Sequence, residues 1–513
     1  MSHYSKLVKN LSTVVKGAGL MLFVTIISYL LQLVFKVFGA PYLGKEAFGL
    51  YEMTVTISSV IGVLSQFGLP TLIKTFIPRL KKQQDFGKLK GIYYFTWGIV
   101  ICLSITYSVL LYSFADLVAS LLGLEIFFAN LLKTFSFFIP FKQFSDIIAS
   151  YFYAEKKFFL AKFPSQGLEQ LFLVFSLFYI IWTNRGILEL VLLLGISYLL
   201  VFLFYLYFYL QDIDCPCDQN AVFRASTWLA FSAPLAFNAV VSFGLKWTDN
   251  FVIASFLSSG ELGIYAISFS LANYLLIYVG LLTNILLPLF SEQHREDRHI
   301  LFEKVRSWVF AITLFTGLIL IFFPRSILNI LFGHEFISGW PSLVILSFFM
   351  ILTAYFKLSH LFIIVEGKTK ILLYVFSCFA ILNIGLSVLL VQIYGITGVA
   401  LATGFSLFML ALTEHRYVYH NFIKFQFDWN ILKFIATGLA SIVITRILAR
   451  ILLPIFSDII VGIGAIFLYT ALFVFGVLVG GVFDKTDIEL ILLVEKKLGI
   501  NLAFVKTLLK KII

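Results

Sequence analysis

The chain has 513 residues, of which 60% are hydrophobic and 13% are charged, and its mean hydropathy is +0.99. A soluble core of this length cannot hide so much apolar surface, so the composition excludes a soluble globular protein. The net charge of +11 does not indicate a nucleic-acid partner, because the basic residues lie in short loops between long apolar stretches. We therefore expect a polytopic membrane protein.

Apolar stretches long enough to cross a membrane recur almost to the C-terminus. A helix needs about 20 apolar residues to span the hydrocarbon layer, whereas a β-barrel would show short alternating strands. The pattern predicts an all-α protein with about fourteen transmembrane helices. We expect them at residues 12–38, 49–76, 90–112, 127–149, 160–182, 188–210, 228–255, 263–289, 306–323, 341–364, 370–392, 395–413, 431–450 and 459–482. The first is too long for a signal-peptide core and is interpreted as a retained helix.

Lysine and arginine residues are distributed unequally between the two sides of this map. With the N-terminal segment on side one, 27 of the 38 lie on side one, 4 on side two and 7 inside spans. Because cytoplasmic loops carry the excess of basic residues, we predict that both termini are cytoplasmic and that the protein lies in the cytoplasmic membrane of the cell. The residues on side two are Lys45, Arg185, Arg325 and Arg450.

The loops and the tail leave no room for a catalytic domain outside the membrane. Phosphate-loop, His-Glu-x-x-His and Gly-x-Ser-x-Gly motifs are absent from the sequence. The seven histidines and four cysteines show no metal-ligand spacing, and we interpret the histidines as solvated. We therefore expect a transporter and not an enzyme, with no catalytic residue, no cofactor and no metal. Residues 483–513 alternate apolar and charged positions, which predicts a cytoplasmic amphipathic tail.

A short sequence between the first two spans recurs later in the chain. The stretch Tyr42–Tyr51 aligns without gaps with Phe256–Tyr265, an offset of 214, and a weaker match of Gly186 with Gly398 has an offset of 212. Chance similarity in an apolar sequence is the alternative. A true repeat would map the first six spans onto spans seven to twelve, and such parallel halves place a substrate path at their interface. The predicted domains are an N-terminal six-helix bundle at 1–212, a C-terminal six-helix bundle at 213–425, transmembrane helices 13 and 14 at 426–482, and the tail at 483–513.

The two copies of the repeat lie in hairpins on the predicted outer side. Glycine tolerates backbone conformations and close approaches that other residues do not. We therefore interpret Gly44, Gly49 and Gly263 as structural residues of these outer hairpins, at tight turns and close packing, and not as substrate ligands.

The chain resembles a known transporter family at Leu43-Gly44, Phe48-Gly49 and Tyr51, at Gly68-Leu69-Pro70, and in the basic loop after Ile77. This family comprises the O-antigen or oligosaccharide-lipid flippases, in the superfamily that also holds multidrug extruders and lipid II flippases. The resemblance implies that Asp249 is the acidic residue often found in the seventh helix of this family. It also implies that Lys74 is the basic residue often found near the end of the second helix. Many relatives have arginine just before Leu-Gly, where this chain has Pro41-Tyr42, so no anion role carries over to that position.

Lysines inside the spans are the sharpest chemical signal. A charge there costs about 3 kcal/mol, so it usually faces a cavity or a partner, although lysines near span ends can also snorkel to the interface. Because lysine binds phosphate as a point charge, the lysines predict a cavity for a diphosphate head group. Its candidate residues are Lys36, Lys74, Lys142, Lys246 and Lys357.

Three intramembrane carboxylates are candidates for charge pairs or ion coupling. Asp146 lies four residues after Lys142, and Asp249 lies three after Lys246, so each pair shares a helix face. Glu169 has no such neighbour. Desolvation favours proton exchange at a buried carboxylate, so a proton or a sodium ion is the expected coupling ion, with structural pairing as the alternative.

The resemblance and the charges together predict a flippase. It would move a polyprenyl-(pyro)phosphate-linked oligosaccharide across the cytoplasmic membrane for cell-surface polysaccharide synthesis, by alternating access of two bundles. The alternatives are an ion-coupled small-molecule or multidrug antiporter and a polytopic glycosyltransferase or polymerase. The expected partners are the lipid-linked oligosaccharide and membrane lipids, and we expect a monomer that binds no nucleic acid.

Overall fold

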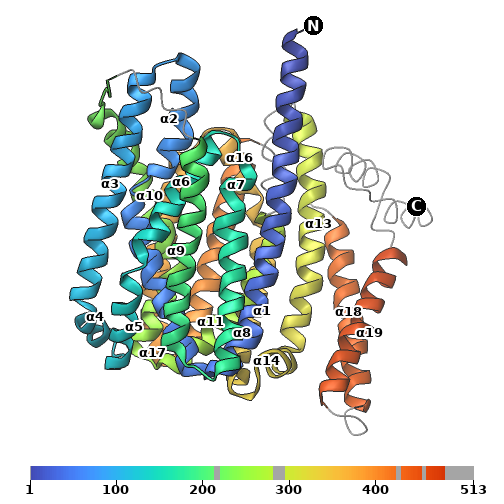
Figure 1. The fold of residues 1–513 in the computed structure, drawn as a ribbon. Helices are drawn as coiled ribbons and strands as arrows, with labels where there is room; N and C mark the ends of the chain where they lie inside the picture. The colour runs from blue at the N-terminus through green and yellow to red at the C-terminus, as the bar shows by residue number, and fades with distance from the viewer. Residues whose placement is uncertain (1, 213–219, 281–294, 423–428, 453–457, 480–513) are drawn as a thin grey trace. The chain divides into compact units, whose positions relative to one another are not determined.

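The computed structural model describes residues 2–212, 220–280, 295–422, 429–452 and 458–479, and its regular elements in these residues are all helices (Figure 1). This confirms the prediction of an all-α polytopic membrane protein. The predicted tail and the loop that holds Cys215 and Cys217 lie outside the described residues. The chain divides into two compact units, Met1–Gly263 and Ile264–Ile513.

The first unit contains the whole range of the predicted N-terminal bundle, 1–212, and one further long helix. Its elements are α1 (Ser2–Gln66), α2 (Leu69–Gln83), α3 (Phe86–Ser113), α4 (Ala115–Leu121), α5 (Ile126–Ser136), α6 (Ile139–Ala154), α7 (Phe158–Lys162), the π-helical segment η1 (Phe163–Leu168), α8 (Glu169–Thr183), α9 (Ile187–Asp212) and α10 (Ala225–Phe256).

The second unit begins within a helix that starts just before the boundary. Its elements are α11 (Ser259–Tyr274), α13 (Arg295–Phe322), α14 (Pro324–Phe332), the 3-10 segment η2 (His334–Gly339), α15 (Trp340–Lys357), α16 (Ser359–Val365), α17 (Thr369–Asn421), α18 (Trp429–Leu452) and α19 (Asp458–Val479).

Within the described residues, nine helical segments are long and apolar enough to cross a membrane. Two of them are longer than one crossing and break at a glycine. Gly44 in α1 has φ 75° and ψ 163°, and Gly395 in α17 has φ 56° and ψ −140°. The break at Gly44 falls between the first two predicted spans, and the break at Gly395 falls at the first residue of the twelfth. Helix α1 therefore accounts for the first span and most of the second, which continues into α2, and α17 accounts for the eleventh and twelfth.

Other predicted spans are built from shorter pieces that meet at prolines. Pro140 occupies the first turn of α6, and Pro164 the first turn of η1. Proline lacks an N–H donor and its ring clashes with the preceding turn, so it starts a helix well but interrupts one that runs through it. The fourth span is therefore α5 plus α6, and the fifth is α7, η1 and α8.

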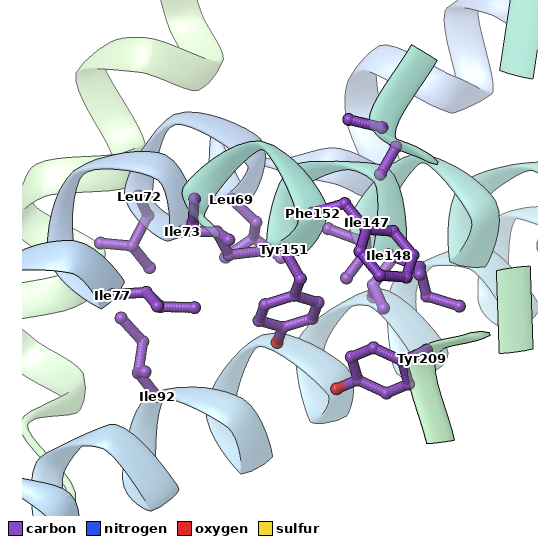
Figure 2. Packing of buried hydrophobic residues seen from close by; sticks show 14 of the residues in the cluster. Leu69, Leu72, Ile73, Ile77, Ile92, Ile147, Ile148, Tyr151, Phe152 and Tyr209 are labelled. Carbon is purple, nitrogen blue, oxygen red and sulfur yellow. The ribbon is translucent and has the colours of Figure 1, made fainter. Parts of the chain in front are cut away.

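The first unit has a core in which α2, α3, α6 and α9 meet. Figure 2 shows the side chains of Ile73, Ile92 and Ile147 turned toward a common interior, with the rings of Tyr151 and Tyr209 beside them. The two tyrosine ring centroids are 5.3 Å apart. The Tyr209 hydroxyl accepts a hydrogen bond from Trp97 Nε1 at 2.8 Å, so the polar end of this ring is satisfied within an apolar surrounding.

The basic loop before α3 is closed by a helix cap. The Asp85 carboxylate accepts a hydrogen bond from the backbone N–H of Lys88 at 3.1 Å and also pairs with the Lys88 ammonium group. An aspartate at this position satisfies an orphan donor of the first helical turn. The hydrogen bonds from Lys88 hold the pKa of the Asp85 carboxyl below its ordinary value.

The packing boundary at residue 263 differs from the repeat boundary expected near residue 212. Helix α10, the predicted seventh span, packs against α1 and α2 in the first unit. One contact that holds it there is a hydrogen bond of 2.7 Å from Asn250 Nδ2 to Thr56 Oγ1. A repeat in the sequence and a unit of packing need not coincide, and the division at 212 stays a prediction.

Candidate functional site

The reversal of the chain in α1 depends on Gly44. Its backbone angles lie in a region that only glycine populates freely. Two residues earlier, the Tyr42 hydroxyl oxygen lies 2.9 Å from the Ile180 carbonyl oxygen and 2.8 Å from that of Arg185. A hydroxyl has one proton, so it shares this between the two acceptors. Tyr42 therefore ties the hairpin to the end of α8.

The same reversal brings Lys36 and Glu52 together. Lys36 Nζ lies 2.8 Å from Glu52 Oε1, and the two side chains are only 16% and 10% exposed. Both residues are eight positions from Gly44, on opposite arms of the hairpin. Glu52 is not within one helical turn of Lys36 in the sequence, but the equal distance of the two residues from the hairpin centre is a sequence signal for this pair.

Lys142 on α6 is the centre of a second charged group. Its Nζ lies 2.5 Å from Glu169 Oε2 on α8 and 3.8 Å from Asp146 Oδ1 one turn further along α6. The sequence predicted the second of these pairs, and the structure adds the first as the closer one. The Tyr198 ring on α9 lies 5.5 Å from the same ammonium group. Glu169 thus acquires a basic partner that its own helix does not provide.

Two amides extend this group toward α1. Gln66 Nε2 donates hydrogen bonds to Asp146 Oδ2 at 2.8 Å and to Gln143 Oε1 at 3.1 Å. We use the name N-terminal charge network for this group together with the Lys36–Glu52 pair, seven residues in all. They are Lys36, Glu52, Gln66, Lys142, Gln143, Asp146 and Glu169. With every group ionised it holds two positive and three negative charges, so uptake of one proton would balance it.

The predicted pair on the seventh span is described only in part. Asp249 lies on α10 with 2% of its surface exposed, next to buried Asn250. The side chain of Lys246 lies outside the described part of the structure. The predicted pairing of Lys246 with Asp249 therefore stays a prediction, although the helix places both residues on one face.

The remaining two candidate lysines lie against aromatic rings. Lys74 on α2 is exposed, and its Nζ lies 4.7 Å from the centre of the Tyr153 ring on α6. Lys357 ends α15 in the second unit, with Nζ 5.6 Å from the centre of the Phe376 ring. Such cation–π contacts hold a charge without neutralising it. Their role as head-group ligands stays a prediction.

The second unit contains a buried polar cluster that the sequence reasoning missed. His360 Nδ1 lies 2.8 Å from Glu414 Oε1, and Glu414 has no exposed surface. The other carboxylate oxygen, Oε2, has no hydrogen-bond partner among the described residues. His415 Nδ1 lies 2.8 Å from the Ser359 hydroxyl. The interpretation of the histidines as solvated is thus wrong for His360 and His415.

The predicted ends of the spans explain this difference. Each predicted span stopped at the first charged residues, which placed Glu414 and His415 in a loop. The structure continues α17 to Asn421 and extends α13 back to Arg295. Arg306, the first residue of the ninth predicted span, is 1% exposed, with its guanidinium carbon 4.8 Å from the Tyr355 ring centre. Polar residues flanking an apolar run can still lie inside a bundle.

The two copies of the repeated sequence meet at a close helix contact. A Cβ atom on Gly49 would lie 1.9 Å from the Ser259 carbonyl oxygen, and one on Gly263 would lie 2.1 Å from the Lys45 carbonyl oxygen. Only hydrogen fits at these two positions. The hairpin of α1 and the start of α11 thus approach backbone to backbone.

Comparison with known families identifies a match over more than half of the chain. A family model described as "Polysaccharide biosynthesis protein" matches residues 14–294. A curated relative, the capsular polysaccharide biosynthesis protein CapF of Staphylococcus aureus, is 29% identical over 264 residues. That alignment covers 47% of this chain and 63% of the relative.

Two solved transporter structures share the fold. The lipid II flippase MurJ in an inward closed conformation has a TM-score of 0.65 at 19% identity, and the match covers 88% of this chain and 97% of that one. A multidrug resistance MATE family transporter of the MOP superfamily, in an inward-facing conformation, has a TM-score of 0.65 at 13% identity. That match covers 79% of this chain and 98% of the transporter.

Proposed function

We propose a function for this chain from one premise, which is that it belongs to the polysaccharide biosynthesis protein family. We infer that it is a flippase that moves a polyprenyl-(pyro)phosphate-linked oligosaccharide from the cytoplasmic to the outer leaflet of the cytoplasmic membrane. The fold that it shares with a lipid II flippase and a multidrug transporter supports transport as the activity.

The observation that carries this proposal is the N-terminal charge network. Lys36 and Lys142 pair with carboxylates inside a bundle of apolar helices, where burying a charge costs free energy. A bundle that only had to fold would be stable with apolar residues at these positions. Intramembrane charges of this kind commonly line the path of a substrate or an ion.

The network suggests how substrate and ion could be coupled. A substrate diphosphate would compete with Glu52 and Glu169 for the two ammonium groups, because lysine binds phosphate strongly. A carboxylate displaced from its lysine would then be stabilised by taking up a proton from water. Release of the diphosphate would reverse both steps. Alternating access of two six-helix bundles would expose the site to each side in turn.

The test is reconstitution of the purified chain in liposomes with a short-chain polyprenyl-diphosphate oligosaccharide in the inner leaflet. We expect a glycosidase outside the vesicles to reach the sugar only when the protein is present, and to reach it more slowly with the Lys36→Ala or Lys142→Ala variant. Equal access with and without the protein would contradict the proposal.

The second candidate is an ion-coupled small-molecule antiporter, which the multidrug transporter fold favours. The same vesicles distinguish it. Uptake of a fluorescent cationic drug driven by a proton or sodium gradient, with no movement of the lipid-linked sugar, would establish the antiporter. Movement of the lipid-linked sugar without drug uptake would establish the flippase.

A further inference from the structure

The second unit contains a pocket with a volume of about 1000 Å³ that the proposed transport does not use. It lies where α13 ends and α14 begins, against the facing sides of α18 and α19. In the view of Figure 1, α18 ends and α19 begins at the bottom of these two helices. The short helix α14 lies at a similar level. The pocket is therefore at the ends of membrane-spanning helices, at the level of a membrane–water interface.

Three guanidinium groups line this pocket, and we call them the arginine triad: Arg325, Arg446 and Arg450. Arg325 is in the first turn of α14 and stacks on Trp340, with its guanidinium carbon 4.7 Å from the ring centre. Stacking fixes the plane of the guanidinium and leaves its edge free to donate hydrogen bonds. Arg325 is thus pre-oriented for a ligand with several oxygen acceptors.

The other two arginines come from one face of α18. Arg446 and Arg450 are one turn apart, so their charges repel each other in the absence of a ligand. Arg446 Nη1 donates a hydrogen bond to the carbonyl oxygen of Phe322, the last residue of α13. That bond uses one of the five donors of the side chain and holds the guanidinium at the pocket.

No carboxylate balances the triad among the described residues that line the pocket. Two of its members, Arg325 and Arg450, also belong to the four basic residues that the charge count places on the outer side. Basic residues are scarce on that side, so their concentration around one pocket is not explained by topology. Snorkelling explains a single arginine at a helix end, but not three that converge.

The rest of the pocket wall is apolar. Val443 and Ile447 lie on α18 between and beside the arginines, and they are 52% and 55% exposed. Such an apolar wall would contribute nothing to the binding of a small water-soluble anion. A lipid would use both parts, because its phosphate accepts bidentate hydrogen bonds from arginine and its acyl chain covers aliphatic side chains.

We propose that the arginine triad binds the phosphate head group of an anionic phospholipid, with an acyl chain of the lipid lying along Val443 and Ile447. This site is separate from the N-terminal charge network, and it does not depend on which substrate the protein transports. A bound lipid would neutralise the repulsion between Arg446 and Arg450 and would join α14 to α18.

The test is native mass spectrometry of the full-length protein in detergent, titrated with phosphatidylglycerol or with phosphatidylcholine. Both lipids have a phosphate, but phosphatidylglycerol has a net negative charge and phosphatidylcholine has none. We expect the wild type to bind phosphatidylglycerol more tightly than phosphatidylcholine, and the Arg325→Gln/Arg450→Gln variant to lose about tenfold in affinity for phosphatidylglycerol. Lysine at both positions should restore part of the affinity, because it keeps the positive charge but lacks the planar guanidinium group that binds phosphate through two hydrogen bonds.

The matched control is Arg185→Gln, which removes an exposed arginine from the same predicted side of the membrane but from another part of the fold. It should bind phosphatidylglycerol as the wild type does. Arg446 is left intact in the variant so that its bond to α13 is preserved, and equal melting temperatures would verify folding. Unchanged affinity in the folded variant, or full competition by inorganic phosphate at the same concentration as the lipid, would overturn the proposal.

Discussion

Gly49 and Gly263 are equivalent residues of the repeated sequence, and each makes the same contact with the other copy. Gly49 approaches the carbonyl oxygen of Ser259, and Gly263 approaches that of Lys45. Lys45 and Ser259 are themselves 214 positions apart, as the two glycines are. A contact that maps onto itself when the copies are exchanged is the signature of a two-fold axis. This geometry supports the proposal that the repeat is structural and not a chance similarity.

Replacing Gly49 by Ala should force the two hairpin segments apart. The added methyl group would lie 1.9 Å from a backbone oxygen, which is not a flexible group that can move aside. Overpacking of this kind costs about 2 kcal/mol. We expect a lower melting temperature in detergent and slower transport, and because the contact is symmetric, Gly263→Ala should have a similar effect.

The control for this pair is Gly98→Ala on α3, where a Cβ atom would meet no other atom within 4 Å. Alanine there should leave the melting temperature unchanged or raise it, since alanine is the better helix former. A wild-type melting temperature in the Gly49→Ala variant would contradict the close contact.

Replacing Lys142 by Ala should destabilise the protein more than replacing Lys142 and Glu169 together by Met and Gln. The single change removes the ammonium group that contacts both Asp146 and Glu169. Loss of one partner of a buried pair costs about 3 kcal/mol. The double change removes one charge of each sign. Melting of the Lys142→Met variant, the Glu169→Gln variant and the double variant completes a double-mutant cycle, and additive effects would show that the pair is not coupled.

Replacing Asp249 by Asn, or Lys246 by Ala, should abolish surface polysaccharide in cells that depend on this protein, with the protein level unchanged. Asp249 is 2% exposed within α10. Burying a carboxylate in the membrane costs free energy, so we expect the residue to be kept for its function. Asp116→Asn is the control, because that carboxylate is exposed and pairs with Lys133 on the surface. Normal surface polysaccharide in both the Asp249 and the Lys246 variants would rule out their role.

Replacing Glu414 by Gln should alter the dependence of transport on the proton gradient without unfolding the protein. Glutamine keeps the shape and can still hydrogen-bond to His360, but it cannot exchange a proton. We expect transport in proteoliposomes to become less sensitive to an imposed pH difference, whereas Glu335→Gln, at an exposed site in η2, should behave as the wild type. Identical pH dependence in both variants would assign Glu414 a purely structural role.

The sequence by itself determined the class of the protein and the location of its long apolar segments. Apolar length is set locally, because each span must satisfy its own backbone hydrogen bonds in lipid. The helix breaks at Gly44 and Gly395 were likewise readable, since they separate apolar runs of span length. The repeat that contains Gly49 and Gly263 was visible in the same way.

Only the tertiary structure decided which charges meet. Lys142 pairs with Glu169 across two helices, and Glu414 pairs with His360 across two others. The arginine triad also joins residues from two helices. Neighbours one helical turn apart can be read from spacing, but partners on different helices depend on how those helices pack and rotate. In a membrane that packing is set by close contacts of small residues and by the polar bonds themselves, so it is a property of the assembled bundle.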